Sequence, residues 1–170
     1  MTTPAYPVYI RTRRWPPRNW YEMDGGWSIA LKLEVPADYS DDRISITKGE
    51  HGGCVVSIHD KVGSNGVTMA PDFRKALPGA FFHDQIYCGE TIRGLCEAWG
   101  WSAARVREWG DKAFREINLL FGLGNPIRRA YYAGVRWLGW PIFWAAYWWP
   151  KVANKTGKCA AELRDIWRAL

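Results

Sequence analysis

The chain has 170 residues, which is enough for one domain with a substantial core. Lys and Arg number 23 and acidic residues 17, so the formal net charge of +6 favours anionic partners such as phospholipid or nucleic acid. The four cysteines include no CxxC pair and no His-rich neighbourhood, which argues against a zinc site. We expect reduced, buried thiols, although Cys88 and Cys96 would be able to pair in an oxidising compartment.

The first residues lack a basic segment followed by an apolar run, so no signal peptide is predicted. The most apolar window, residues 130–149, is long enough to span a bilayer but carries Arg136 and Pro141 near its middle. No transmembrane helix is therefore expected.

Residues 1–20 contain four Pro, four Arg, two Trp and two Tyr without any periodicity, which predicts an extended arm. Arginines interleaved with Trp15 and Trp20 are able to grip phosphate and stack on bases, so nucleic acid is one possible partner. We favour instead a surface arm that lies on its own domain or on a neighbouring subunit. Residues 21–170 are predicted to form a single domain.

Apolar residues alternate cleanly over residues 27–35, which predicts a half-buried strand. Residues 43–47 and 54–59 are predicted as shorter strands, separated by glycines. Residues 61–67 have the composition of a turn or loop. Residues 21–70 are therefore expected to be mainly strands and loops that form a small antiparallel sheet.

From residue 71 onward the pattern is helical. A first helix opens at Pro78 and ends near Gly89, and Ser102 is the predicted N-cap of a helix that runs to about residue 121. Further helices are expected over residues 125–138, from Pro141 onward, and over residues 159–170. The predicted fold class is α+β, with a small N-terminal antiparallel sheet packed on a helical bundle.

His83 and Tyr87 are four residues apart and so share one helix face, whereas Asp84 points about 100° away from His83. Asp111 follows Gly110 inside the helix predicted to begin at Ser102. A helical glycine costs about 1 kcal/mol relative to alanine, so Gly110 suggests the close approach of another helix. We predict an antiparallel helix pair that brings Asp111 to the His83 imidazole.

A histidine held by a carboxylate is able to act as a general base on water. Asp84 would be left to hold a hard cation together with carbonyls of the loop at residues 63–67, and that cation would polarise an ester carbonyl. The alternative is that His83, Asp84 and Asp111 form a buried polar network that only fixes helix packing.

A His-Asp pair, a Tyr four residues after the His, and a later helical Asp resemble the catalytic core of the phospholipase A2 superfamily. The bacterial and fungal members, which have few disulfides, are the nearer comparison. The resemblance implies that His83 is the base, Asp111 its orienting acid and Tyr87 a supporting hydroxyl. It also implies a calcium site, whose ligands would be Asp84 with Gly63, Asn65 and Val67.

The order of motifs over residues 27–145 is also similar to a family of small phage and prophage proteins of unassigned function. The shared features are a segment at residues 65–71, a His-Asp-x-x-Tyr helix, a later Asp-x-x-Phe and a tail rich in Trp and Arg. Asn65 stands where that family usually has an acid. This resemblance implies a location in a virion or a host cell.

The tail carries Trp137, Trp140, Trp144 and Trp148 at helical spacing among basic residues, which suits the headgroup zone of a bilayer. The competing interpretation is that these rings cover the domain itself or another virion protein. The leading hypothesis is a phage-type, phospholipase A2-like esterase acting at a phospholipid surface, with calcium and no small-molecule cofactor. Its rival is a non-catalytic virion or assembly protein that binds neighbouring subunits through its arm and its tail.

Overall fold

Seven strands followed by four helices make up the part of the chain that the computed structural model describes, which comprises residues 9–15, 18–50, 52–64 and 74–148. The strands are β1 Tyr9–Trp15, β2 Arg18–Met23, β3 Trp27–Leu31, β4 Tyr39–Ser40, β5 Ile44–Lys48, β6 Cys54–Ile58 and β7 Gly63–Ser64. The helices are α1 Leu77–Ile86, α2 Gly89–Trp99, α3 Ala103–Leu120 and α4 Asn125–Trp148. The predicted α+β class is confirmed.

The larger sheet has the antiparallel order β3-β6-β5-β4, and its central register aligns Ile29 with Val56 and Val56 with Ile46. All three of these side chains are buried, so one face of the sheet is apolar. The strands predicted at residues 27–35, 43–47 and 54–59 correspond to β3, β5 and β6. β3 ends earlier than predicted, at Leu31, because its partner strand begins opposite it at Cys54.

The smaller sheet has the order β1-β2-β7. Within the stretch predicted as an extended arm, residues 9–15 and 18–20 are instead strand, and β1 pairs antiparallel with β2. β2 in turn pairs with β7, which lies within the turn or loop predicted at residues 61–67. Apolar and polar residues do not alternate in β1 and β2, so their pairing was not predicted from the sequence.

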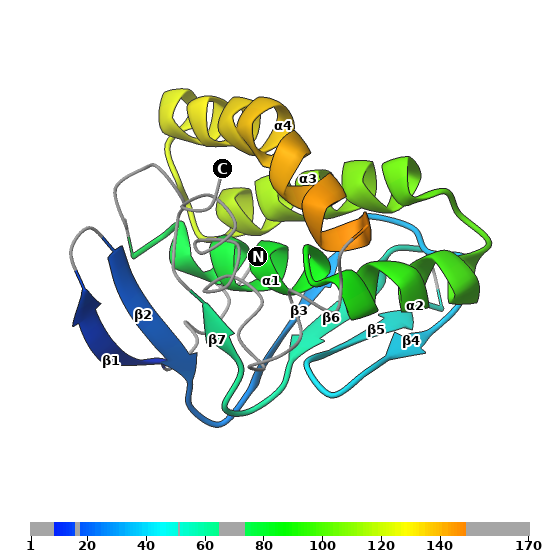
Figure 1. Ribbon diagram of the computed structural model, residues 1–170, viewed down its shortest axis with the longest axis horizontal. Helices are drawn as coiled ribbons and strands as arrows, with labels where there is room; N and C mark the ends of the chain where they lie inside the picture. Colours follow the sequence, from blue (N-terminus) through cyan, green and yellow to red (C-terminus); the bar gives the residue numbers. More distant parts are fainter. Residues whose placement is uncertain (1–8, 16–17, 51, 65–73, 149–170) are drawn as a thin grey trace.

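The helix boundaries follow the predicted caps with two exceptions. The Ser102 hydroxyl accepts a hydrogen bond from the Arg105 backbone N–H at 3.3 Å, and Gly122, just beyond α3, adopts a left-handed φ of 71°. The first exception is α1, which ends at Ile86, so that Gly89 is not the end of this helix but the first residue of α2. The second is α4, which continues through Pro141 instead of ending near residue 138. A proline inside a helix removes one backbone hydrogen bond and bends the helix, and Figure 1 shows a bend in α4. The helix predicted over residues 159–170 lies outside the described residues.

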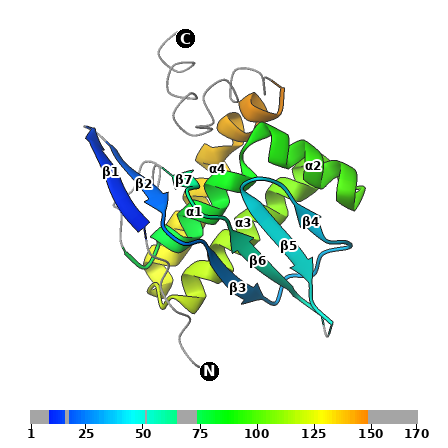
Figure 2. The ribbon, with the colours of Figure 1, turned by 90° about the horizontal axis from the view of Figure 1, so that it is seen from below.

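The domain has three layers, namely the four-stranded sheet, a layer of three helices, and α4. The four-stranded sheet covers one side of the layer that contains α1, α2 and α3 (Figure 2), and α4 lies on the opposite side of α3 (Figure 1). The core between the sheet and the helices includes the fully buried side chains of Phe81, Phe82, Ile86, Ile92 and Ile117. Within the described residues, no helix has both the length and the apolar character of a membrane span.

The three cysteines within the described residues form no disulfide bond. Cys88 and Cys96 are not joined by a disulfide, and the Cys88 Sγ donates to the backbone carbonyl of Asp84 at 3.5 Å. Burial raises the pKa of the Cys54 thiol to about 12, so this group stays protonated at neutral pH.

The pair α1 and α3 is antiparallel and closely packed, as the sequence predicted. Gly79 near the start of α1 lies against Asn118 near the end of α3, whereas Ile86 at the end of α1 lies against Gly110. A Cβ atom on Gly110 would lie 2.6 Å from Cγ2 of Ile86. The predicted reason for a helical glycine at this position is therefore confirmed.

Replacing Gly110 with Ala is expected to lower the free energy of unfolding by about 1–3 kcal/mol, because the new methyl group overlaps Ile86. The matched control is Gly134→Ala in α4, where no heavy atom lies within 4 Å of the added Cβ. That change is expected to stabilise the protein by about 0.5–1 kcal/mol. Denaturant unfolding of the two variants measures both effects, and equal stabilisation by both changes would contradict the close approach.

Candidate active site

His83 and Asp111 meet at the centre of the α1–α3 pair. His83 lies in the last turn of α1 and Asp111 in the middle of α3. The distance from His83 Nε2 to Asp111 Oδ1 is 3.0 Å, with Asp111 fully buried and His83 only 7 % exposed. The imidazole also packs on the Tyr87 ring, with the ring centroids 4.1 Å apart. The contact predicted from the sequence is present.

Asp111 receives donors on both carboxylate oxygens. The Tyr87 hydroxyl donates to Oδ1 at 2.9 Å, which is the supporting contact predicted for this tyrosine. Oδ2 accepts a hydrogen bond from Arg136 Nη1 at 3.1 Å and has Arg107 Nη2 at 3.8 Å. Arg107 Nε donates to the Tyr87 hydroxyl at 3.2 Å, so the five side chains form one connected network.

This environment keeps Asp111 ionised. Burial alone would raise the pKa of Asp111, but hydrogen bonds from His83 and Tyr87, together with the charge of Arg107, hold the pKa below its ordinary value. Burial and the Asp111 charge raise the pKa of Tyr87, so its hydroxyl keeps its proton and donates. The Arg136 guanidinium loses hydration, but its hydrogen bond to Asp111 raises its pKa.

An ionised Asp111 determines which nitrogen of His83 carries the proton. A carboxylate accepts but does not donate, so the proton of a neutral imidazole lies on Nε2 and the lone pair on Nδ1. No hydrogen bond to Nδ1 is found from the residues that the structure describes. Some buried polar atoms of that part of the chain are fully enclosed and lack a partner, but Nδ1 is not one of them, so its surface is not closed off. It is therefore the atom available to take a proton from water.

Asp84 lies outside this network and faces the short strand β7. Its Oδ2 accepts a hydrogen bond from the Ser64 hydroxyl at 2.6 Å, and the neighbouring Gln85 amide donates to the Gly63 carbonyl at 2.9 Å. These contacts tie α1 to β7, next to the β2–β7 ladder.

The described residues by themselves do not form a calcium cradle. They provide one carboxylate, from Asp84, and one loop carbonyl, from Gly63, and both already accept hydrogen bonds from the protein. No group of three or more His, Cys, Asp or Glu side chains with metal-binding geometry occurs within the described ranges. The other predicted ligands, Asn65 and Val67, lie outside those ranges.

Sequence reasoning missed Arg107 and Arg136, which both approach Asp111 Oδ2. Arg107 precedes Asp111 by four residues on one helix, which is the spacing of a helical ion pair, so a local signal existed. Arg136 is 25 residues away from Asp111 and reaches it only because α4 crosses α3. Nothing in the local pattern marks that contact.

Comparisons with protein-family models, curated proteins and solved structures returned no significant match.

Replacing Asp111 with Asn is expected to lower the free energy of unfolding by about 3–5 kcal/mol, because the buried Arg107 guanidinium loses its charged partner. The folded state depresses the pKa of Asp111, so its stabilising contribution is present above the ordinary carboxyl pKa of about 4 and is lost as the pH falls further. Denaturant unfolding between neutral and acidic pH measures how much stability is lost on acidification, and this pH-dependent loss should be smaller in the Asp111→Asn variant than in the wild type.

Glu108→Gln is the matched control, because Glu108 is an exposed carboxylate on the same helix that pairs with Lys112 at 2.7 Å. An exposed pair contributes about 0–1 kcal/mol, so this variant should stay close to the wild type. Equal losses from the two variants would contradict a special role for the buried carboxylate.

Proposed function

We propose that the protein is a phospholipase A2-like esterase in which His83 acts as the general base on water. The observation that carries this proposal is the hydrogen bond of His83 Nε2 to a buried, ionised Asp111 that Tyr87 also holds. It fixes the tautomer that leaves Nδ1 as a base, and it holds the ring in one orientation. The substrate class proposed is a lipid ester presented at an interface.

In this reaction a water molecule next to Nδ1 gives a proton to His83 while its oxygen attacks the ester carbonyl carbon. The imidazolium that forms is stabilised by Asp111, which keeps its negative charge throughout. When the bond to the leaving oxygen breaks, His83 returns the proton to that oxygen, and the products are a carboxylic acid and an alcohol. Arg107 and Arg136 keep Asp111 ionised during this cycle.

Calcium at Asp84 remains a separate part of the proposal, and no step above depends on it. When bound, a divalent cation there would polarise the ester carbonyl and stabilise the oxyanion. Asp84 and Gly63 are the described residues that would hold it, in exchange for their present contacts with Ser64 and Gln85.

The second candidate function is a non-catalytic structural or assembly role in a virion. It is favoured by the same network, because the contacts of Asp111 join α1, α3 and α4 and would stabilise their packing without any reaction. The exposed indole rings of Trp137, Trp140 and Trp148 would then contact neighbouring subunits.

The esterase proposal is tested by incubating the protein with mixed phospholipid vesicles and measuring the fatty acid that is released. Activity is expected from the full chain, and His83→Ala is expected to reduce it by at least about 100-fold, because the general base is lost. His59→Ala is the matched control, since His59 follows β6 and makes no contact with the Asp111 network in the described structure.

Two further measurements separate the esterase from the structural role. A chelator and Asp84→Asn should each abolish hydrolysis if calcium takes part and should leave it intact if the protein groups suffice. A folded protein without any hydrolysis in either condition would rule out the esterase and leave the structural role.

A further inference from the structure

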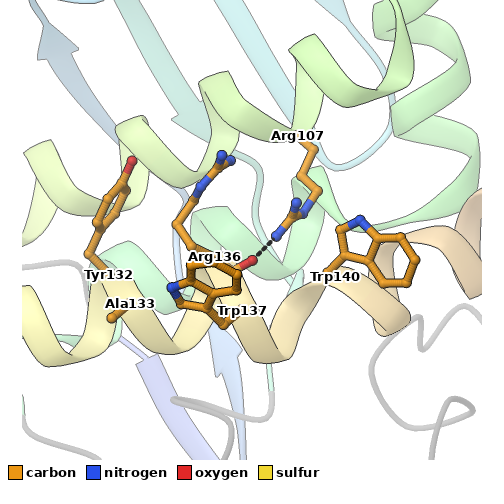
Figure 3. Close-up of a pocket in the computed structure, with 6 residues that line it drawn as sticks. All are labelled: Arg107, Tyr132, Ala133, Arg136, Trp137 and Trp140. Carbon is orange, nitrogen blue, oxygen red and sulfur yellow. Dashed lines mark hydrogen bonds between the residues drawn. The ribbon is translucent and has the colours of Figure 1, made fainter.

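A pocket of about 610 Å³ lies between α3 and α4, on the side of Asp111 that faces the arginines. Figure 3 shows Arg107 reaching down from α3, with Arg136 and the aromatic rings projecting from α4. The pocket is lined by Arg107, Tyr132, Ala133, Arg136, Trp137 and Trp140. His83 is not part of the lining, so this space is distinct from the proposed hydrolytic site.

The charges around the pocket do not balance. Two guanidinium groups, from Arg107 and Arg136, share the single carboxylate of Asp111. Glu108 also acts on Arg136 through its charge, but it forms a 2.7 Å pair with Lys112. Among the described residues, Arg107, Arg136 and Lys112 thus face only two carboxylates, and a partly desolvated place with an excess positive charge favours an anion.

Arg136 is the side chain best placed to bind that anion. Its side chain is 34 % exposed, and its contact with Asp111 uses Nη1. A guanidinium presents several donors in a planar fork that matches phosphate oxygens, so Arg136 is able to hold Asp111 and a phosphate at once. Arg107 is more deeply buried and donates to the backbone carbonyls of residues 135 and 136, which fixes the inner wall of the pocket.

The remaining wall is aromatic and unusually exposed. Trp137 is 80 % exposed and Trp140 is 55 % exposed, and both lie beside the arginines in Figure 3. Leu138 and Trp148 are further exposed apolar residues of α4. Exposed indole rings next to cationic side chains are the composition that settles at the headgroup level of a bilayer.

We infer that this pocket and the outer face of α4 bind the phosphate headgroup of an anionic phospholipid in a membrane surface. Arg136 takes the phosphate, and Trp137 and Trp140 insert beside it among the glycerol backbones. A free phosphate would need only the guanidinium, so the exposed rings favour the lipid as the source. The inference deepens the proposed function by naming the lipid class, but binding does not require hydrolysis.

The test is co-sedimentation of the full chain with vesicles of ether-linked phosphatidylcholine, with and without ether-linked phosphatidylglycerol. Ether lipids have no ester to cleave, so binding is measured apart from catalysis. Retention is expected on phosphatidylglycerol and should fall as salt rises. Equal retention on both vesicle types, or none on either, would overturn the inference and leave this face to a protein partner.

Variants locate the binding surface. Arg136→Gln is expected to weaken retention about fivefold, because one cationic contact is lost, whereas Arg129→Gln removes an exposed charge of the same helix outside the pocket and should have little effect. The double change Trp137→Ser with Trp140→Ser should weaken retention at least about tenfold. Leu119→Ser, at an exposed apolar residue of α3, is its control.

Three results separate this inference from its neighbours. Retention that survives both pocket changes would place lipid binding elsewhere and overturn the inference. Binding of glycerol phosphate in solution without retention on vesicles would overturn the choice of a lipid. His83→Ala should bind ether vesicles like the wild type, because binding does not use the imidazole. If the wild-type protein binds vesicles but never hydrolyses esters, the proposed function is refuted and the inference stands.

Discussion

The carboxylate of Asp111 is the group on which the arrangement of the helices depends. It is fully buried, and its two oxygens are contacted by His83 of α1, by Arg107 of α3 itself and by Arg136 of α4. Taking a carboxylate out of water costs several kcal/mol unless its charge and its lone pairs are matched. The three helices must therefore hold their donors in place together, and a shift of any one of them leaves a buried charge unmatched.

Small residues make this convergence possible. Gly110 allows Ile86 of α1 to approach α3 one residue away from Asp111, and Gly139 allows α4 to pass the Tyr87 hydroxyl, which lies 3.1 Å from the position of an added Cβ. Larger side chains at these two positions would push apart the helices that carry the donors. The packing of the core and the geometry of the candidate site are thus consequences of the same close contacts.

Arg136 connects two regions with different chemistry. Toward the interior it holds Asp111, which orients His83, and toward the surface it lines the pocket beside Trp137 and Trp140. A phosphate bound at this arginine would lie only one side chain away from the His83–Asp111 pair. If the protein is an esterase, its hydrolytic site and its lipid-docking face would share Arg136. If its role is structural, the helix network and the subunit contact would share the same residue.

The sequence alone determined the features that depend on neighbours along the chain. These include the shared face of His83 and Tyr87, the Ser102 cap, the alternation in β3 and the need for a close contact at Gly110. Only the tertiary structure decided the contact of Arg136 with Asp111, the passage of α4 through Pro141 and the pairing of β1 with β2. The reason is that local periodicity specifies which face of an element is buried, whereas the crossing of distant elements specifies which side chains meet on that face.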